Sequence, residues 1–271
     1  MVFTYLLLLQ FVLLFLFFPS VTVSSMGIKE RKIKILLGLL LFSNDSLSTV
    51  ELTSTIQYAL DLTLNQKTKT TLSHLVKEGV IEKSEGDNLS YTLTERGLNE
   101  LYLEFPFFRF LKTTWDGKWR VLSYEIPEKK RELRDRLRRV VAGWGLGPWH
   151  RSFWLTPHPI VPNLRQLVSQ REEEKYIQAF EADHVFGERE ILIEKVWSTK
   201  EIDTQYRTLF KKWHDILAGD ESKQKKLALV LTEYVTLLRI DPGLPKELVG
   251  EQWIGFEAYS IFKEIRSILL A

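Results

Sequence analysis

The chain has 271 residues and no cysteine. This absence excludes disulfides, thiol nucleophiles and cysteine-ligated zinc sites, and it permits a reducing compartment. An excess of one charge is also lacking, because the formal net charge is only +2. A protein that coats nucleic acid through a uniformly basic surface is therefore excluded, whereas a local basic face is not. The chain is too long for one domain with a single small hydrophobic core, so its length predicts two or three domains.

Charged residues are absent from the first 25 positions, which form a largely apolar extension. A secretory leader normally begins with basic residues, and none precedes this run. Its length is near the roughly 20 residues that span a bilayer, so a membrane anchor is an alternative. The basic residues between Lys29 and Lys34 would then keep the body cytoplasmic. We favour Met26 as the true start of a cytoplasmic protein, because the folded pattern begins just after it.

Hydrophobic periodicity and turn residues predict an N-terminal domain over residues 26–112. The pattern indicates three helices, a hairpin around Gly86, Asp87 and Asn88, and a fourth helix. This order is that of a winged helix-turn-helix. The expected helices are residues 28–42, 49–60 with Ser48 as N-cap, 65–79 with Asn65 as N-cap, and 95–105 with Thr94 as N-cap; the expected strands are residues 80–83 and 89–93.

The third helix of this domain has two different faces. Leu72, Leu75 and Val76 form an apolar stripe at helical spacing, and polar and basic side chains lie opposite. A helix of this kind fits the major groove of DNA, and lysines suit phosphate. The alternative is an exposed helix with ordinary lysines, or a protein-docking winged helix. The expected contacts to double-stranded DNA are Gln66, Lys67, Lys69, Thr70, Ser73, His74, Lys77 and the wing residue Lys83.

A β-α-β-β-α-β order predicts a ferredoxin-like domain over residues 113–196. Its first strand is expected at residues 119–126, and Pro127 and Glu128 begin the first helix. The buried stripe of this helix is expected to contain Leu133, Leu137, Val140 and Trp144. A second stripe, made of Arg131, Arg134 and Arg138, faces away from it. These arginines are interpreted either as a solvated helix face with local carboxylate partners or as a contact to an effector or a second subunit.

Residues 197–271 predict a helical C-terminal domain. Ser198 and Glu201 have the spacing of a capping box, and the helices that follow have continuous apolar faces. No catalytic residue, metal site or cofactor is expected anywhere in the chain. The "GWGLG" run lies between a helix and a strand, the wrong order for a nucleotide-binding loop. His150 and His158 lack a third ligand for zinc.

Three stretches of the sequence resemble known families. The stretch "HLVKEGVIEKSEGDNLSYTLTERG" resembles the recognition helix and wing of bacterial winged-helix regulators. The stretch "WDGKWRVLSYEIPEKKRELRDRLRRVVAGWGLGPWHRSFWLTPHP" resembles the central domain of the PaaX family, the repressors of phenylacetic acid catabolism operons. The pattern R-x-D-P-x-L-P-x-E-L, which begins at Arg239, resembles the PaaX C-terminal region.

The resemblance implies an α+β, multidomain transcriptional repressor that binds an inverted-repeat operator as a homodimer. It also implies release by an aryl-CoA effector such as phenylacetyl-CoA. The PaaX central domain is itself similar to small CRISPR-associated ferredoxin-like endonucleases, so a metal-dependent nuclease is the alternative function. In that nuclease family an aspartate closes the first strand and acts at a metal. Here the position carries Glu125, which we expect to be structural.

Overall fold

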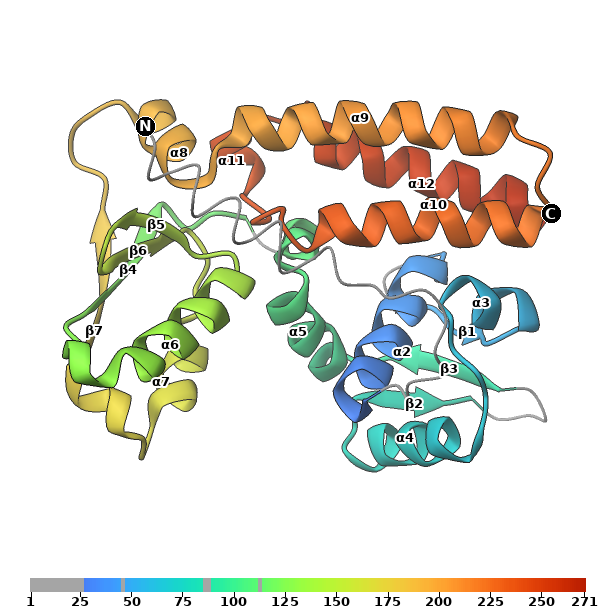
Figure 1. Ribbon diagram of the computed structural model, residues 1–271, viewed down its shortest axis with the longest axis horizontal. Coiled ribbons are helices and arrows are strands. Elements are labelled where there is room, and N and C mark those ends of the chain that lie inside the picture. The colour runs from blue at the N-terminus through green and yellow to red at the C-terminus, as the bar shows by residue number, and fades with distance from the viewer. Residues whose placement is uncertain (1–26, 45–46, 85–88, 112–113) are drawn as a thin grey trace.

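The computed structural model describes residues 27–44, 47–84, 89–111 and 114–271. They form a mixed α+β protein with sheets in the N-terminal and central segments and a helical C-terminal segment. Figure 1 shows the C-terminal helices along one side, with the central sheet and the N-terminal segment next to each other beneath them. The expectations for residues 1–25 and for Gly86, Asp87 and Asn88 lie outside the described residues. Within those residues, no helix is long and apolar enough to cross a membrane.

In the N-terminal segment, the described residues form four helices around an antiparallel sheet with the strand order β1-β3-β2. The predicted caps Asn65 and Thr94 each accept a backbone N–H bond in the first turn of a helix. Apolar residues from all four helices form the core of this segment. The elements are α2 (Ile28–Phe42), β1 (Val50–Glu51), α3 (Ser54–Ala59), α4 (Gln66–Lys77), β2 (Ile81–Lys83), β3 (Ser90–Leu93) and α5 (Glu95–Glu104).

The prediction of one helix over residues 49–60 is wrong. Val50 instead pairs with Tyr91 as part of a third strand, and α3 begins only after Thr53. The Thr53 side chain accepts the N–H of Ile56 at 3.4 Å, whereas Ser48 accepts an N–H from Asn44 and caps no helix. Pairing with a distant strand decided this outcome, because β-branched residues such as Val50 suit a strand at least as well as a helix.

The central segment contains the predicted β-α-β-β-α-β order in one antiparallel sheet with the strand order β5-β6-β4-β7. Helices α6 and α7 cover the same face of this sheet (Figure 1). The first helix begins with a short 3-10 turn rather than directly at Pro127. The elements are β4 (Lys118–Tyr124), η2 (Glu128–Lys130), α6 (Arg131–Gly143), β5 (Gly147–His150), β6 (Phe153–Thr156), α7 (Val161–Val168), η3 (Glu172–Tyr176) and β7 (Ile177–Asp183).

The two faces of the central sheet belong to different hydrophobic clusters. Leu122 and Tyr124 pack beneath α6 and α7, whereas Trp119 and Val121 lie on the opposite face. On α6, Leu137 is buried as predicted, but the next buried residue is Val141, fully inaccessible, so the prediction of Val140 is wrong by one position. One residue rotates a helix by about 100°, and the sequence offers a valine at both positions, so only packing could choose between them.

The C-terminal helices share one core with the N-terminal segment. Trp213, Tyr206, Tyr234 and Phe262 are fully buried among them, and the Trp213 indole donates to the Val230 carbonyl at 3.1 Å. A 3-10 segment, η1 (Pro106–Leu111), connects α5 to the central segment. The helices are α8 (Arg189–Trp197), α9 (Thr199–Ala218), α10 (Lys223–Leu238), α11 (Lys246–Val249) and α12 (Ile254–Leu270).

The predicted capping box at the start of α9 is wrong. Ser198 has a positive φ of 51° and its side chain caps nothing. Glu194 takes that role, since its carboxylate accepts from the Thr199 hydroxyl at 2.7 Å and from the Lys200 N–H at 3.0 Å. Helix α8 directly precedes α9 and turns the chain at Ser198, which leaves that hydroxyl outside the first turn of α9.

Gly97 allows α5 to pack against the hairpin, and this contact gives a testable prediction. A Cβ at Gly97 would lie 2.2 Å from the Val80 carbonyl oxygen and 2.7 Å from Leu93 Cδ1. We expect Gly97→Ala to lower the free energy of unfolding by about 1–3 kcal/mol, as overpacking usually does. Urea denaturation measures this change.

Gly143→Ala is the matched control, because a Cβ there meets nothing within 4 Å. It should be neutral or stabilising by up to about 1 kcal/mol, since alanine restricts the unfolded chain. Equal effects of the two substitutions would contradict the contact at Gly97.

Candidate nucleic-acid interface

Helix α4 is anchored to the N-terminal segment by one face. Its N-cap, Asn65, accepts the N–H of Thr68 at 3.0 Å, and the buried Thr68 hydroxyl donates to the Thr63 carbonyl at 2.6 Å. Leu72 and Leu75 are buried on the same side. Val76 was expected in this stripe but is 36% exposed, and Thr71 occupies the inward position instead. The helix is thus held in a fixed rotation about its own axis.

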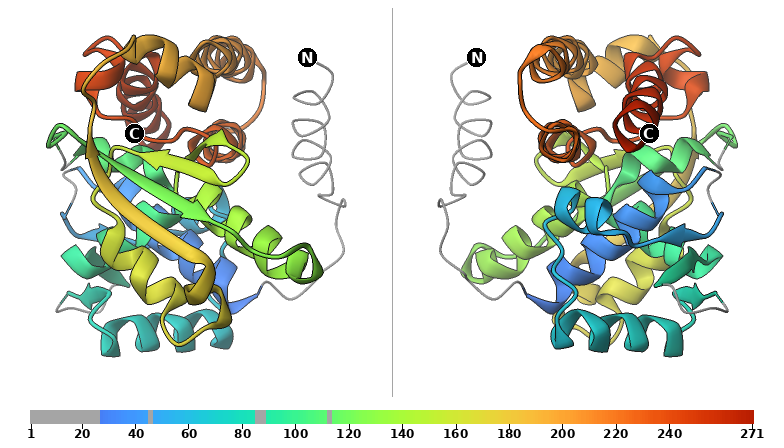
Figure 2. Two further views of the ribbon diagram at one scale, coloured as in Figure 1. Left: turned by 90° about the vertical axis from the view of Figure 1, so that its left-hand side faces the viewer. Right: turned by 90° about the vertical axis from the view of Figure 1, so that its right-hand side faces the viewer.

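The opposite face of α4 is exposed, and every predicted DNA contact lies in solvent. Figures 1 and 2 show α4 on the side of the molecule away from the C-terminal helices, so none of those helices covers this face. Lys83 extends the same set onto strand β2 of the hairpin. The exposed side chains are Gln66, Lys67, Lys69, Thr70, Ser73, His74, Lys77 and Lys83.

The charge on this face is of one sign. Helix α4 contains no aspartate or glutamate, and its first turn has no acidic residue. Among the described residues, the ammonium groups of Lys67, Lys69 and Lys77 are in no ion pair. The positive end of the helix dipole adds to this potential. A polyanion is therefore attracted to the outer face of α4.

Two of the predicted contacts also have local partners. The Thr70 hydroxyl donates to the Gln66 carbonyl at 2.9 Å, so only its lone pairs face outward. His74 Nδ1 lies 3.2 Å from the Glu78 carboxylate at the C-terminal end of α4, and the His74 side chain remains 69% exposed. Glu78 also approaches Lys32 of α2 at 3.8 Å. These contacts orient the two side chains without burying them.

The arginine stripe of α6 is largely engaged within its own segment. Arg134 pairs with Glu128 at 2.5 Å, and Arg138 donates to the Tyr124 hydroxyl at 2.6 Å and to the Arg151 carbonyl at 2.9 Å. Arg131 is exposed and lines a crevice of about 410 Å³ at the start of α6. Three glutamates line the same crevice, so its charge is mixed: Glu128, Glu132 and Glu172. The contacts of Arg134 and Arg138 favour a structural role for both.

Glu125 lies just past strand β4 with its side chain exposed. Its backbone N–H donates to the Tyr176 carbonyl at 2.9 Å, which is a structural contact. In the described part of the chain, no group of three or more histidine, aspartate or glutamate side chains could hold a metal ion. His150 is exposed and His158 is buried, so the two do not share an environment.

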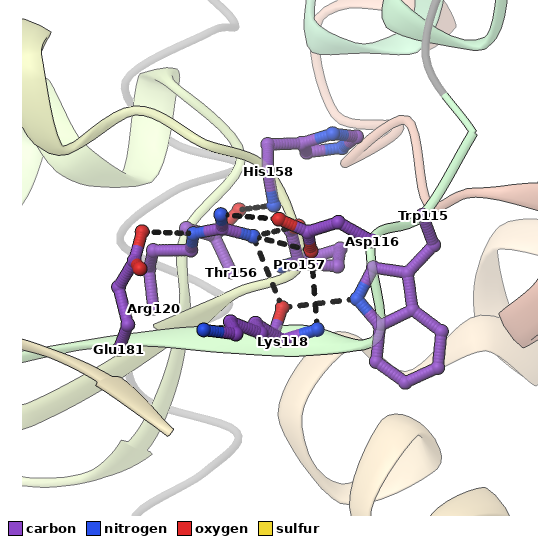
Figure 3. Close-up of polar contacts among 8 residues, drawn as sticks. All are labelled: Trp115, Asp116, Lys118, Arg120, Thr156, Pro157, His158 and Glu181. Atoms are coloured by element: carbon purple, nitrogen blue, oxygen red, sulfur yellow. Dashed lines mark hydrogen bonds and ion pairs between the residues drawn. The ribbon is translucent and has the colours of Figure 1, made fainter. Parts of the chain in front are cut away.

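A buried arginine between two carboxylates, which the sequence analysis missed, lies at the end of the central sheet. Figure 3 shows the Arg120 guanidinium between Asp116 and Glu181. Both Asp116 oxygens accept from it, at 2.5 and 2.7 Å, and Glu181 accepts at 3.1 Å. The Pro157 carbonyl accepts a further bond at 3.1 Å. The available signal was the i,i+4 spacing of Asp116 and Arg120, but the partner on β7 is 61 residues away and only the sheet brings it near.

Comparison with known proteins decides the family. Residues 112–191 match the PaaX protein central Cas2-like domain, and residues 197–271 match the PaaX-like protein C-terminal domain. Together these matches span more than half of the chain. The chain belongs to the PaaX family. The resemblance found in the sequence of the central and C-terminal segments is thereby confirmed, while neither PaaX match covers α4.

A solved structure, "Uncharacterized protein Rv0674 from Mycobacterium tuberculosis", is also similar to this PaaX-family chain. It has 19% sequence identity and a TM-score of 0.49, over 88% of this chain and 97% of that chain. No curated protein sequence matches the chain.

The Arg120 cluster gives a prediction about acid stability. A bidentate hydrogen bond from Arg120 lowers the pKa of Asp116 from 3.8 to about 2. Because the pKa is lower in the folded state, this pair stabilises the protein above about pH 4 and loses its effect as pH falls toward 2. We expect Asp116→Asn to cost of the order of 1 kcal/mol at pH 7, discounted because Asp116 is half-exposed, and almost nothing at pH 2.

Urea denaturation of both proteins at several pH values measures this difference. Asp203→Asn is the control, because it removes an exposed i,i+4 pair with Arg207 on α9. That change should have little effect on the free energy of unfolding at any pH, because solvent screens the pair. An Asp116→Asn effect that persists at pH 2 would show that the ion pair is not its cause.

Proposed function

We propose that this PaaX-family protein is a DNA-binding transcriptional repressor that acts in the cytoplasm. Its N-terminal segment, residues 26–112, is a winged helix-turn-helix with α4 as recognition helix and β2 and β3 as the wing. The boundaries of the central ferredoxin-like domain, 113–196, and of the helical domain, 197–271, belong to the same proposal. The observation that carries it is the outer face of α4, which is exposed, polar and basic over its whole length.

The chemistry of this face fits duplex DNA. Gln66 is at the N-terminal end of α4, where side chains reach base edges in the major groove, and its amide can pair with adenine. Thr70, Ser73 and His74 follow at helical spacing with shorter polar groups. Lys67, Lys69, Lys77 and Lys83 supply phosphate contacts, which set affinity and its salt dependence.

A homodimer is part of the proposal, because two recognition helices read two half-sites of an inverted repeat. The surface that supports it best is the part of the central sheet that α8 leaves uncovered on the side opposite α6 and α7, which we call the open sheet face. Phe153 and Phe180 are 40% and 53% exposed, on the same face as Val121 and opposite α6 and α7. Exposed aromatic groups on a sheet face are typical of interfaces. Arg131 remains the one arginine of the α6 stripe available for a further contact.

Substitution of two lysines on α4 tests the DNA-binding function. Lys67→Ala combined with Lys77→Ala should abolish specific binding to duplexes selected from a random pool by the wild-type protein. The slope of log affinity against log salt should flatten by roughly 2, because each phosphate contact contributes about 0.9. Gel-shift titrations at several salt concentrations measure both quantities.

The control removes the same charge elsewhere. Lys212→Ala with Lys225→Ala deletes two exposed lysines, paired with Glu233 and Glu221, on the C-terminal helices. This protein should bind DNA as the wild type does. Equal affinity and slope for the α4 double variant would reject the interface.

Release by an aryl-CoA is the regulatory part of the proposal, and it rests on PaaX-family membership. An effector that binds better to a conformation unsuited to the operator weakens DNA affinity by that preference. We expect phenylacetyl-CoA to raise the apparent Kd for the selected duplex by about 5-fold to 150-fold. Fluorescence anisotropy measures this, with coenzyme A and phenylacetate alone as controls. An unchanged Kd would remove the effector from the proposal and leave DNA binding in place.

A further inference from the structure

Three segments that are distant in sequence meet at one point of the fold. The first is the start of η1, at Pro106 and Phe107, where the N-terminal segment ends. The second is the turn between α6 and β5, at Trp144 and Gly145. The third is the loop from Asp241 to Leu244, which follows α10. We call this meeting point the joint.

The backbones at the joint touch one another directly. Gly243 has a φ of +65°, and a Cβ there would lie 2.0 Å from the Pro106 carbonyl oxygen. Gly145 has a φ of +81°, and its Cβ would lie 2.8 Å from the Pro242 oxygen and 2.9 Å from Pro106 Cβ. Glycine is the residue that tolerates both the positive φ and the close approach. At both glycines the segments are therefore in direct van der Waals contact.

One hydrogen bond joins two of these segments, and two others tie the segments to neighbouring elements. Arg109, in η1, donates to the Trp144 carbonyl at 2.7 Å, and His158 Nε2 donates to the Gly243 carbonyl at 2.7 Å. The Trp197 indole donates to the Gly145 carbonyl at 3.1 Å. Burial and the charge of Arg109 lower the pKa of His158 well below its usual value, so the ring is neutral and its Nε2 proton belongs to this bond. In Figure 3 the His158 ring turns away from Arg120.

Asp241 fixes the third segment to the C-terminal helices. Its carboxylate is buried and accepts from the Tyr206 hydroxyl at 2.8 Å, from the Trp253 indole at 3.3 Å and from the Gly243 N–H at 2.8 Å. The loop therefore cannot shift without breaking bonds to both α9 and the start of α12. The joint is a rigid connection between three parts of the chain, each with its own hydrogen-bonded support.

The joint also fixes the direction in which α4 points. Helix α5 runs directly into η1, with Phe105, Phe107 and Phe108 fully buried at the transition. Helix α2 packs against both α5 and α4. A continuous packed path thus leads from the joint to α4, while the central sheet leaves the joint on the other side. The separation between α4 and the open sheet face is set there together with the packing of α3 on α10 and the Arg266 bonds to the Leu41 and Ser43 carbonyls.

We propose that the joint determines the half-site spacing of the operator, by fixing the placement of the winged helix relative to the surface through which two copies associate. This proposal rests on the DNA-binding homodimer proposed above. A rigid joint allows one separation between the two recognition helices of a dimer, whereas a loosened joint allows several. The joint residues contact no DNA, so they act by positioning.

Two variants loosen the joint to different degrees. Gly243→Ala puts a methyl group against the Pro106 backbone, and His158→Phe keeps a ring of similar size but removes the bond to Gly243. The duplexes carry either one selected half-site or two. In the two-site duplexes the natural spacer is kept or lengthened by about 5 base pairs, which turns one half-site by about half a turn of the helix. Fluorescence anisotropy gives the Kd for each duplex.

The wild type should prefer the natural spacer by about tenfold or more, equivalent to 1.4 kcal/mol. Both variants should reduce this ratio to about threefold or less, and their affinity for a single half-site should stay within about twofold of the wild type. The control is Leu164→Ala, which removes buried carbon from α7, a helix that is not part of the joint, although Trp144 packs against the same cluster. It destabilises the protein but should keep the wild-type ratio.

Each other outcome has a definite meaning. A wild-type ratio retained by both variants overturns the inference, as does an equal loss of the ratio in Leu164→Ala, which would indicate general loosening. A wild type that binds single half-sites but ignores the spacer overturns the inference and leaves DNA binding intact. A wild type that binds no duplex removes the proposed function itself. If Gly243→Ala does not fold, His158→Phe alone decides between these outcomes.

Discussion

At Gly243, the backbone of the C-terminal segment lies so close to the Pro106 carbonyl that nothing larger than a hydrogen atom fits between them. Gly145 makes a similar approach from the central segment. Hydrogen bonds from the buried side chains of Arg109 and His158 hold the three segments of the joint in place. The backbones at such a contact cannot shift, because protein interiors are close-packed and the neighbouring residues are themselves held by further contacts. The contact at Gly243 is one of those that fix the relative placement of the N-terminal segment, the central sheet and the C-terminal helices.

The outer face of α4, unlike the joint, depends only on contacts within the N-terminal segment. Its inner side is fastened by Thr68, Leu72 and Leu75, and the lysines opposite are exposed. Affinity for a polyanion needs only this local arrangement. A longer operator with two half-sites requires more, because two such faces must be held at one distance and one angle. In the proposed function, the outer face of α4 provides affinity for DNA, and the joint sets the distance and angle between the two copies of α4 in a dimer.

Local signals in the sequence were sufficient to predict several helices and the exposed face of α4. The first helix has the predicted bounds, Ile28–Phe42, because its apolar run and flanking residues lie within a few turns of one another. The exposure of Gln66, Lys67, Lys77 and their neighbours followed from helical periodicity and one N-cap. The errors have two different causes. Val50 joined a strand through Tyr91, a distant partner that no short window of sequence shows. Ser198 lost its capping role to the nearby Glu194, because the end of α8 at Ser198 brings that carboxylate to the first turn of α9.

By itself the sequence determined which face of α4 is polar and basic, since spacing along a helix places side chains whatever surrounds it. It also carried the family resemblance in the central and C-terminal stretches. Only the tertiary structure decided that Arg120 sits between Asp116 and Glu181, and that Pro106, Gly145 and Gly243 meet. Apart from the Asp116–Arg120 pair, these contacts join residues that are 39 to 137 positions apart. Their existence depends on how whole segments pack, which no local propensity encodes.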